Sequence, residues 1–197
     1  MAVVTASCPP APSDEQLLGR FAGGDQEVLD ELFKRYRLVA YRVAYRLLGN
    51  EADALDAVQD GFVKALTHLP GFQGRSTFKT WLLRVVSNAA LDLGRQRSRR
   101  EGFSLDGLGN GNRESYERLS LDDPADGLAR EDLRRLLGRA LAALPEAQRK
   151  TFVLHAEAEL TYKEVAEVLE ISIGTVMSRL FYARKKLRTF LLRVMNV

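Results

Sequence analysis

Hydrophobic residues in this chain recur every three or four positions, which is the spacing of one side of an α-helix. In the first hundred residues this period predicts a short helix after Ser13 and longer helices at about 27–48, 52–69 and 77–97. In the last third of the chain it predicts three or four further helices. The alternation typical of strands is absent, so the sequence predicts an all-α fold.

The helical period stops in residues 102–127, a segment rich in Gly, Asn, Asp and Ser. Residues 102–128 carry six acidic and two basic side chains, whereas the segments on either side are mildly basic. This composition is typical of a connector without fixed structure. The sequence therefore predicts an acidic flexible linker at 102–127 between two helical domains, at 13–101 and 128–194.

The most specific local pattern is a helix-turn-helix in residues 161–188. Thr161 and Glu164 have the spacing of a capping box at a helix start, and Ser172 is placed to cap the next helix. At about 100° per residue the second helix has one apolar stripe that must be buried. This stripe consists of Val176, Leu180, Ala183, Leu187 and Phe190.

The opposite side of that helix is polar and basic, apart from three residues with large apolar side chains. From Arg179 to Arg193 there are six basic residues and no acidic one. A cationic helix alone is often a solvated surface, but a capped partner helix and a tight turn before it favour DNA binding in a major groove. Phe181 is expected to be exposed and to have a binding partner, because a bare aromatic ring is costly in water.

A second set of candidate residues lies between Phe72 and Arg99. The helix predicted at 77–97 has an apolar stripe and a separate polar one that contains Asn88, Asp92 and Arg95, with Trp81 at the border. Aromatic rings can stack on unpaired bases, an amide can read a base edge, and arginines can follow phosphates. The alternative is that the rings belong to the core and the arginines to a solvated face.

The helix predicted at 52–69 has Asp53, Asp56 and Asp60 on one side, with Gln59 beside them. A divalent metal would need ligands from a second segment, and no His or Glu partner is evident, so no metal site is predicted. An acidic surface for docking another protein is the favoured interpretation.

The amino-acid composition narrows the classes of protein to which the chain can belong. The chain is 46% hydrophobic and 28% charged, which is ordinary for a globular protein. Its one cysteine, Cys8, excludes an internal disulfide, and two histidines with that cysteine offer no metal-ligand spacing. There is no signal peptide and no run of about 18 apolar residues, so we expect a cytoplasmic protein without membrane insertion.

In their order along the chain, these motifs resemble bacterial sigma factors of the extracytoplasmic-function (ECF) group, which have only the second and fourth conserved sigma regions. The resemblance covers about residues 14–100 and 128–192. It implies a promoter-recognition subunit without catalytic residues, cofactor or small-molecule substrate. The partners it implies are core RNA polymerase, through the largest-subunit clamp and the flap, promoter DNA and an anti-sigma factor.

The same resemblance implies three sites. The helix that docks on core polymerase contributes Asp53, Asp56, Gln59, Asp60 and Phe62. The region that reads the minus-ten element contributes Phe72, Gln73, Ser76, Thr77, Lys79, Trp81, Asn88, Asp92, Arg95 and Arg97; Phe72 and Asn88 help form a pocket for a flipped-out base. The helix that reads the minus-thirty-five element contributes Ser172, Gly174, Thr175, Met177, Ser178, Phe181, Tyr182 and Lys185.

Three positions depart from the family pattern. Glu170 stands where these turns commonly have glycine, which costs about 1 kcal/mol if the backbone is left-handed. Met177 and Tyr182 stand where many relatives have arginine or lysine, so fewer bidentate base contacts are available. Two other classes remain open: a dimeric helix-turn-helix regulator that binds duplex DNA without polymerase, and an enzyme built on the aspartates of the third helix.

Overall fold

The computed structural model describes residues 11–101 and 127–195, so Cys8 and residues 102–126 of the predicted linker lie outside the described residues. The described residues form eight α-helices and one short 3-10 turn and contain no strand, which confirms the all-α prediction. By their contacts they group into two units, one ending at Tyr36 and one starting at Arg37. The domain boundaries expected from the sequence stay a prediction.

The first unit holds α1 (Asp14–Ala22) and the beginning of α2 (Val28–Leu48). Ser13 and Gln16 form the capping box at the start of α1, as the sequence predicts. The Asp14 carboxylate accepts a hydrogen bond from Arg35 Nη1 at 2.6 Å and another from the Tyr36 hydroxyl. These bonds tie the start of α1 to the first half of α2.

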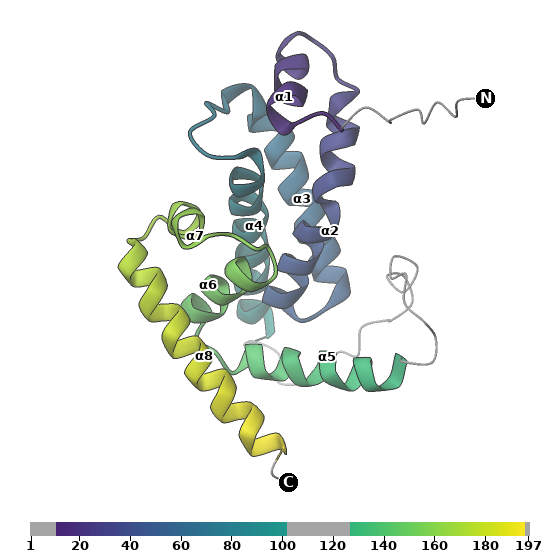
Figure 1. Cartoon of the computed structure of the whole chain (residues 1–197). Coiled ribbons are helices and arrows are strands. Elements are labelled where there is room, and N and C mark those ends of the chain that lie inside the picture. Colours follow the sequence, from purple (N-terminus) through teal and green to yellow (C-terminus); the bar gives the residue numbers. More distant parts are fainter. Residues whose placement is uncertain (1–10, 102–126, 196–197) are drawn as a thin grey trace, which may run out of the picture. The chain divides into compact units, whose positions relative to one another are not determined.

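In the second unit, α3 (Glu51–His68), the 3-10 turn η1 (Leu69–Gly71) and α4 (Phe78–Glu101) follow the end of α2. Figure 1 shows α3 and α4 side by side. They approach closely at Gly61, because a Cβ there would be only 2.9 Å from Val86 Cγ2. Absence of a side chain at Gly61 thus lets the two helices pack closely.

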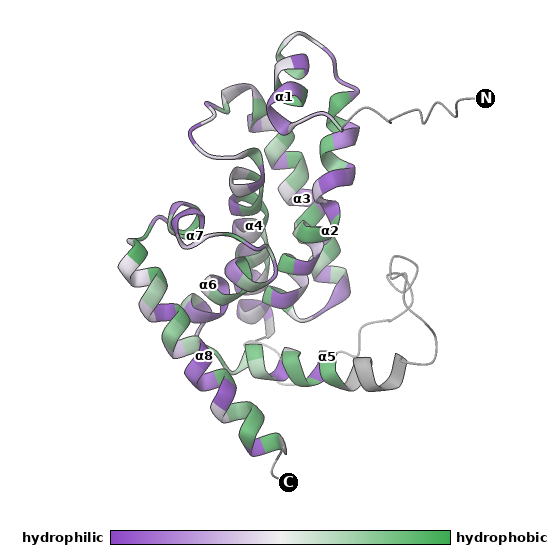
Figure 2. Cartoon of the chain, in the orientation of Figure 1, coloured by the Kyte–Doolittle hydropathy of each residue, from purple (hydrophilic) through white to green (hydrophobic). Residues whose placement is uncertain are grey.

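The same unit contains α5 (Gly127–Ala142), α6 (Glu146–Ala156), α7 (Tyr162–Leu169) and α8 (Ile173–Met195). α8 packs against each of the other three. Most of its predicted apolar stripe is buried, since Val176, Leu180 and Ala183 are at most 1% exposed and Leu187 is 7% exposed, but Phe190 is only half-buried. Figure 2 shows the resulting division of the helices into hydrophobic and hydrophilic sides.

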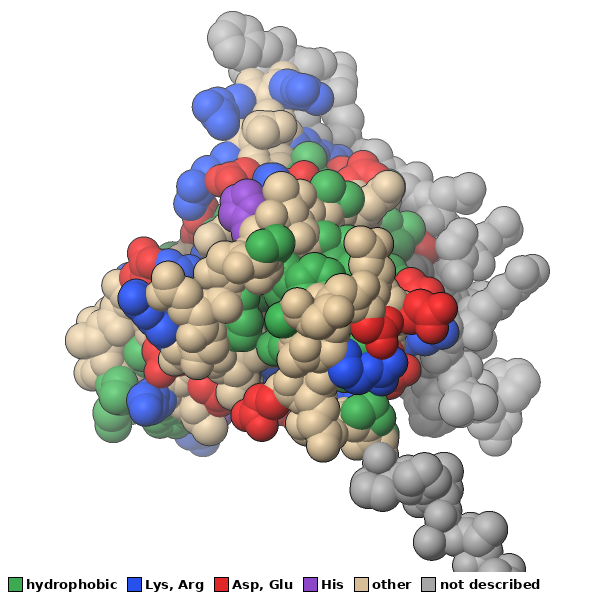
Figure 3. Space-filling model, turned by 90° about the horizontal axis from the view of Figure 1, so that it is seen from above, with side chains coloured by type: hydrophobic (Ala, Val, Ile, Leu, Met, Phe, Trp, Pro, Cys, Tyr) green, Lys and Arg blue, Asp and Glu red, His purple; other side chains and the backbone are tan. Residues whose placement is uncertain are grey.

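The predicted helices agree closely with the observed ones, except that α4 continues to Glu101. No Gly or Pro stands between Arg97 and Glu101 to stop it, so the predicted end is too early. No described helix is both long and apolar enough to cross a bilayer. On the face seen in Figure 3, acidic and basic side chains lie interspersed rather than forming a field of one sign.

In the turn between α7 and α8, a residue other than glycine has a left-handed backbone conformation. Glu170 has φ 53° and ψ 44°, and its amide donates to the carbonyls of Ala166 and Glu167. The amide of Ile171 donates to the Ala166 carbonyl at 3.1 Å. The turn is therefore a common type of left-handed helix end, but it has glutamate at the position where glycine would be free of strain.

We expect Glu170→Gly to stabilise the protein by about 0.5–1 kcal/mol, because glycine adopts this conformation without the clash of a Cβ. The ion pair of Glu170 with Arg84 is largely exposed, and its loss costs little. Urea unfolding of both proteins measures the change. Glu167→Gly, inside α7, is the control and should destabilise by about 1 kcal/mol; a loss in both variants would contradict the prediction.

Candidate nucleic-acid and polymerase interfaces

The helix-turn-helix is held by the side-chain caps that the sequence predicts. Thr161 Oγ1 accepts from the Glu164 amide at 3.3 Å, and Glu164 Oε2 accepts from the Thr161 amide at 2.9 Å. At the start of α8, Ser172 Oγ accepts from the Thr175 amide at 3.1 Å and lies 2.9 Å from Thr175 Oγ1. These bonds satisfy free amides at both helix starts.

Burial of the apolar stripe of α8 leaves Met177, Phe181 and Tyr182 exposed by 55%, 62% and 53%. Ser178 and Lys185 are also exposed on this helix, and Ser178 Oγ donates to the Thr175 carbonyl at 3.0 Å. We call the shallow hollow on this side the α8 groove. It is lined by Tyr162, Met177, Phe181, Arg184, Lys185 and Arg188.

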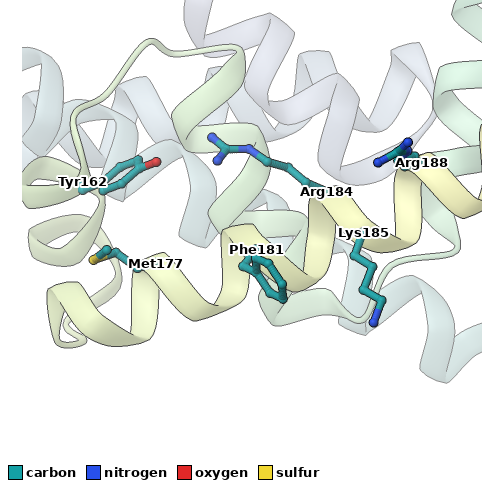
Figure 4. A pocket seen from close by; sticks show the side chains of 6 residues that line it. All are labelled: Tyr162, Met177, Phe181, Arg184, Lys185 and Arg188. Carbon is teal, nitrogen blue, oxygen red and sulfur yellow. The ribbon is translucent and has the colours of Figure 1, made fainter.

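Figure 4 shows how these side chains lie. Met177, Phe181 and Lys185 follow one another along one side of α8, and Arg184 extends toward the Tyr162 ring. The Phe181 ring meets that of Tyr182 edge to face, with centroids 5.4 Å apart. The groove therefore offers apolar surface bordered by cations, and α8 has no carboxylate to repel an anion.

Three aromatic rings form a second cluster at the start of α4. The Phe72 centroid lies 5.1 Å from that of Trp81 and 6.2 Å from that of Phe78. Phe78 is 6% exposed and belongs to the core, whereas Phe72 and Trp81 are half-buried. The alternative that Phe72 and Trp81 belong to the core therefore holds only in part, because both rings keep exposed surface that a base can contact.

The loop before α4 is shaped by a left-handed glycine and a hydroxyl cap. Gly74 has φ +66°, and the Thr80 amide donates to Thr77 Oγ1 at 3.1 Å. Gln73 and Thr77 are exposed, while Ser76 and Lys79 are half-buried. The loop residues named from the sequence therefore lie around the aromatic cluster and not inside the core.

The polar row of α4 consists of Asn88, Asp92 and Arg95, which are all exposed. Asn88 Oδ1 accepts from Lys150 Nζ at 2.9 Å, and Arg95 Nη2 donates to Glu146 Oε1 at 2.9 Å. Burial and the nearby cation of Arg95 lower the pKa of Lys150 to about 8. Asn88 and Arg95 thus already have partners, so a DNA strand must displace these bonds to use the same atoms.

Arg97 and Asp53 were assigned to different sites from the sequence, but the structure pairs them. Arg97 Nη1 donates to Asp53 Oδ2 at 2.6 Å, and Asn50 Nδ2 donates to the same oxygen at a short distance. Burial acts to raise the pKa of Asp53, but the bonds from Asn50 and Arg97 hold this pKa below its usual value. Asp53 therefore joins α3 to α4 and is not a free docking group.

The outer side of α3 carries Asp56, Gln59 and Asp60, all exposed, with Asp60 paired to Lys64 at 2.7 Å. Phe62 does not reach this surface, because it is 6% exposed and turns into the core. The assignment of Phe62 to a docking surface needs correction: its position on the helix places it on the buried side. Phe62 supports α3 from within.

Sequence reasoning missed three apolar residues on the same side of α3. Leu55, Val63 and Leu66 are exposed by 37%, 57% and 44%. At about 100° per residue they fall within the arc of about 140° that contains Asp56 and Asp60. Their position outside the buried stripe was the available signal. We call this mixed acidic and apolar surface the α3 outer face. It consists of Leu55, Asp56, Gln59, Asp60, Val63 and Leu66.

Among the described residues, no three His, Cys, Asp or Glu side chains are grouped so that they could hold a metal ion. The aspartates of α3 follow one helix side, and Asp53 is bound to Arg97.

Comparison with known proteins identifies the family of this chain. Residues 32–100 match Sigma-70 region 2, and residues 134–187 match Sigma-70, region 4. The ECF RNA polymerase sigma-E factor of Escherichia coli (strain K12) is 33% identical over 175 residues, covering 88% of this chain and 91% of that protein. The ECF sigma factor SigE of Mycolicibacterium smegmatis is 35% identical over 175 residues, covering 86% of this chain and 65% of that one.

Solved structures give the same result. CnrH, in complex with the cytosolic domain of CnrY, has a TM-score of 0.67 and 27% identity and covers 89% of this chain and 94% of its own. RpoE of Bartonella quintana, in complex with the anti-sigma factor NepR, has a TM-score of 0.62 and 25% identity, covering 82% and 96%. The chain therefore belongs to the ECF group of the sigma-70 family of RNA polymerase sigma factors.

Proposed function

We propose that this sigma factor divides its work among three surfaces. The α3 outer face docks on core RNA polymerase, the start and polar row of α4 hold the opened minus-ten element, and α8 reads the minus-thirty-five element in the major groove. The polymerase supplies the chemistry of RNA synthesis in the cytoplasm, and this subunit selects where it starts.

One observation carries the proposal. A single chain combines an acid-free helix in a helix-turn-helix with half-exposed aromatic rings beside an amide and arginines on another helix. The first arrangement suits duplex DNA and the second suits unpaired bases. Opening DNA costs a few kcal/mol for each base flipped from the stack, and contacts to the trapped strand offset that cost.

The structural relatives support control by an anti-sigma factor. CnrH was solved in complex with the cytosolic domain of CnrY, and RpoE in complex with the anti-sigma factor NepR. Val63 on α3 and Phe181 on α8 are large exposed apolar residues that a protein partner can cover. We propose that an anti-sigma factor inhibits this chain by covering the surfaces used for polymerase and DNA.

The decisive test adds the purified chain to sigma-free bacterial core polymerase with a library of promoter fragments. We expect transcripts only when both proteins are present, since the polymerase supplies the chemistry of RNA synthesis. Specific duplex binding by the chain alone, with no effect of core polymerase on transcription, would instead support a conventional regulator.

If the α3 outer face docks on core polymerase, substitutions in it should weaken the complex with core. We expect Asp56→Lys and Val63→Asp each to weaken binding to core polymerase by about tenfold, because both change exposed residues of the α3 outer face. Fluorescence anisotropy of the labelled chain titrated with core measures the affinity. Glu167→Lys, an exposed charge reversal on α7, is the control. Unchanged affinity in both α3 variants would remove the assignment.

If α4 holds a strand of the opened minus-ten element, loss of a contact to that strand should slow promoter opening. We expect Asn88→Ala to slow promoter opening by about tenfold, as loss of one hydrogen bond to a trapped base implies, while core affinity stays the same. Permanganate reactivity of unpaired thymines over time measures opening. Gln96→Ala removes an exposed amide from the same helix and should leave opening unchanged. Equal losses in opening and core binding would indicate damage to the fold.

A further inference from the structure

We infer that α8 reads its promoter element mainly through the methyl groups of thymine, which contact Met177 and Phe181, and not through the edges of guanine. This inference rests on the proposed function, in which α8 enters the major groove. It goes further by naming the base that the helix selects.

The first observation is an apolar strip on a helix that is otherwise polar outside. Met177 and Phe181 are four residues apart, so they lie one above the other on the same side, and both are more than half exposed. The contact of Phe181 with Tyr182 restricts the ring. Within the described residues, this strip has no neighbour that buries it, and its surface is available for a ligand.

Charge selects the kind of ligand. The α8 groove holds Arg184, Lys185 and Arg188 beside the apolar strip, and the helix contains no acidic residue. A surface that pairs apolar side chains with cations alone suits DNA, whose phosphates are anionic. The apolar group that the major groove displays is the methyl group of thymine, and apolar side chains recognise thymine by contacting it.

The distribution of cations argues against guanine. In a helix-turn-helix, the N-terminal residues of the recognition helix contact the base edges. The first nine residues of α8, from Ile173 to Phe181, contain both residues of the apolar strip and one cation, Arg179, which is half-buried. Bidentate bonds to guanine need Arg or Lys at the base edge. The remaining cations begin at Arg184, beyond both Met177 and Phe181 along the helix.

The test uses the chain with core polymerase and promoters randomised over the upstream element. Active promoters are sequenced, and each enriched thymine is then replaced by uracil, which keeps the hydrogen-bonding edge and removes only the methyl group. We expect thymine at two or more positions and about fourfold weaker binding for each contacted thymine replaced, as burial of one such group predicts.

A double-mutant comparison assigns the contact. In Phe181→Ala or Met177→Ala, replacement of the thymine that each side chain contacts should cost less than 1.5-fold, because the partner of the methyl group is already gone. Leu133→Ala removes a side chain that is 63% exposed on α5 and should keep the full uracil effect.

Three results would overturn the inference while leaving the proposed function intact. They are active promoters with no enriched thymine in the element, uracil substitution without effect, and a uracil effect of equal size in both α8 variants. Failure of transcription with core polymerase would be a different outcome, because it would contradict the proposed function itself.

Discussion

Burial of one side of each long helix determines what its other side can contact. In α8, Val176, Leu180 and Ala183 are almost fully enclosed, so a rotation that hid Phe181 would expose them. Burial of Val176 and Leu180 together stabilises by about 3–6 kcal/mol, which exceeds the cost of about 1.5–3 kcal/mol for leaving the Phe181 ring in water. The binding surfaces are therefore consequences of the core, and their residues are held in place by packing behind them.

Two of these surfaces lie on α3 and α4, which pack closely against each other. Gly61 allows α3 to approach the backbone of Val86 on α4, and Asp53 with Arg97 adds a polar connection between the same helices. The same packed pair of helices thus carries both the α3 outer face and the polar row of α4. Polymerase docking and strand capture are assigned to different sides of this pair, so an altered contact inside it affects both.

Local features were predictable from the sequence, and features that depend on distant residues were not. The caps at Thr161 and Ser172 and the left-handed turn at Glu170 involve neighbours along the chain, and all three were anticipated from spacing or from the departure from glycine. The pairing of Asp53 with Arg97 joins residues 44 positions apart, and the inward direction of Phe62 depends on which arc of α3 meets α4. Periodicity identifies a buried stripe but does not fix its edges. Leu55 and Leu66 lie just beyond that stripe, whereas Val63 lies near the centre of the α3 outer face.

The absence of carboxylates from α8 has a physiological consequence. Its six cations gain much of their affinity for phosphate from the entropy of the counterions they displace, and that gain shrinks as the surrounding salt becomes more concentrated. Methyl contacts of Met177 and Phe181 carry no such dependence. A rise in intracellular potassium would therefore weaken the grip on every sequence alike while leaving the preference among sequences nearly unchanged, so that the ionic content of the cell sets how many promoters are occupied and the apolar strip sets which ones.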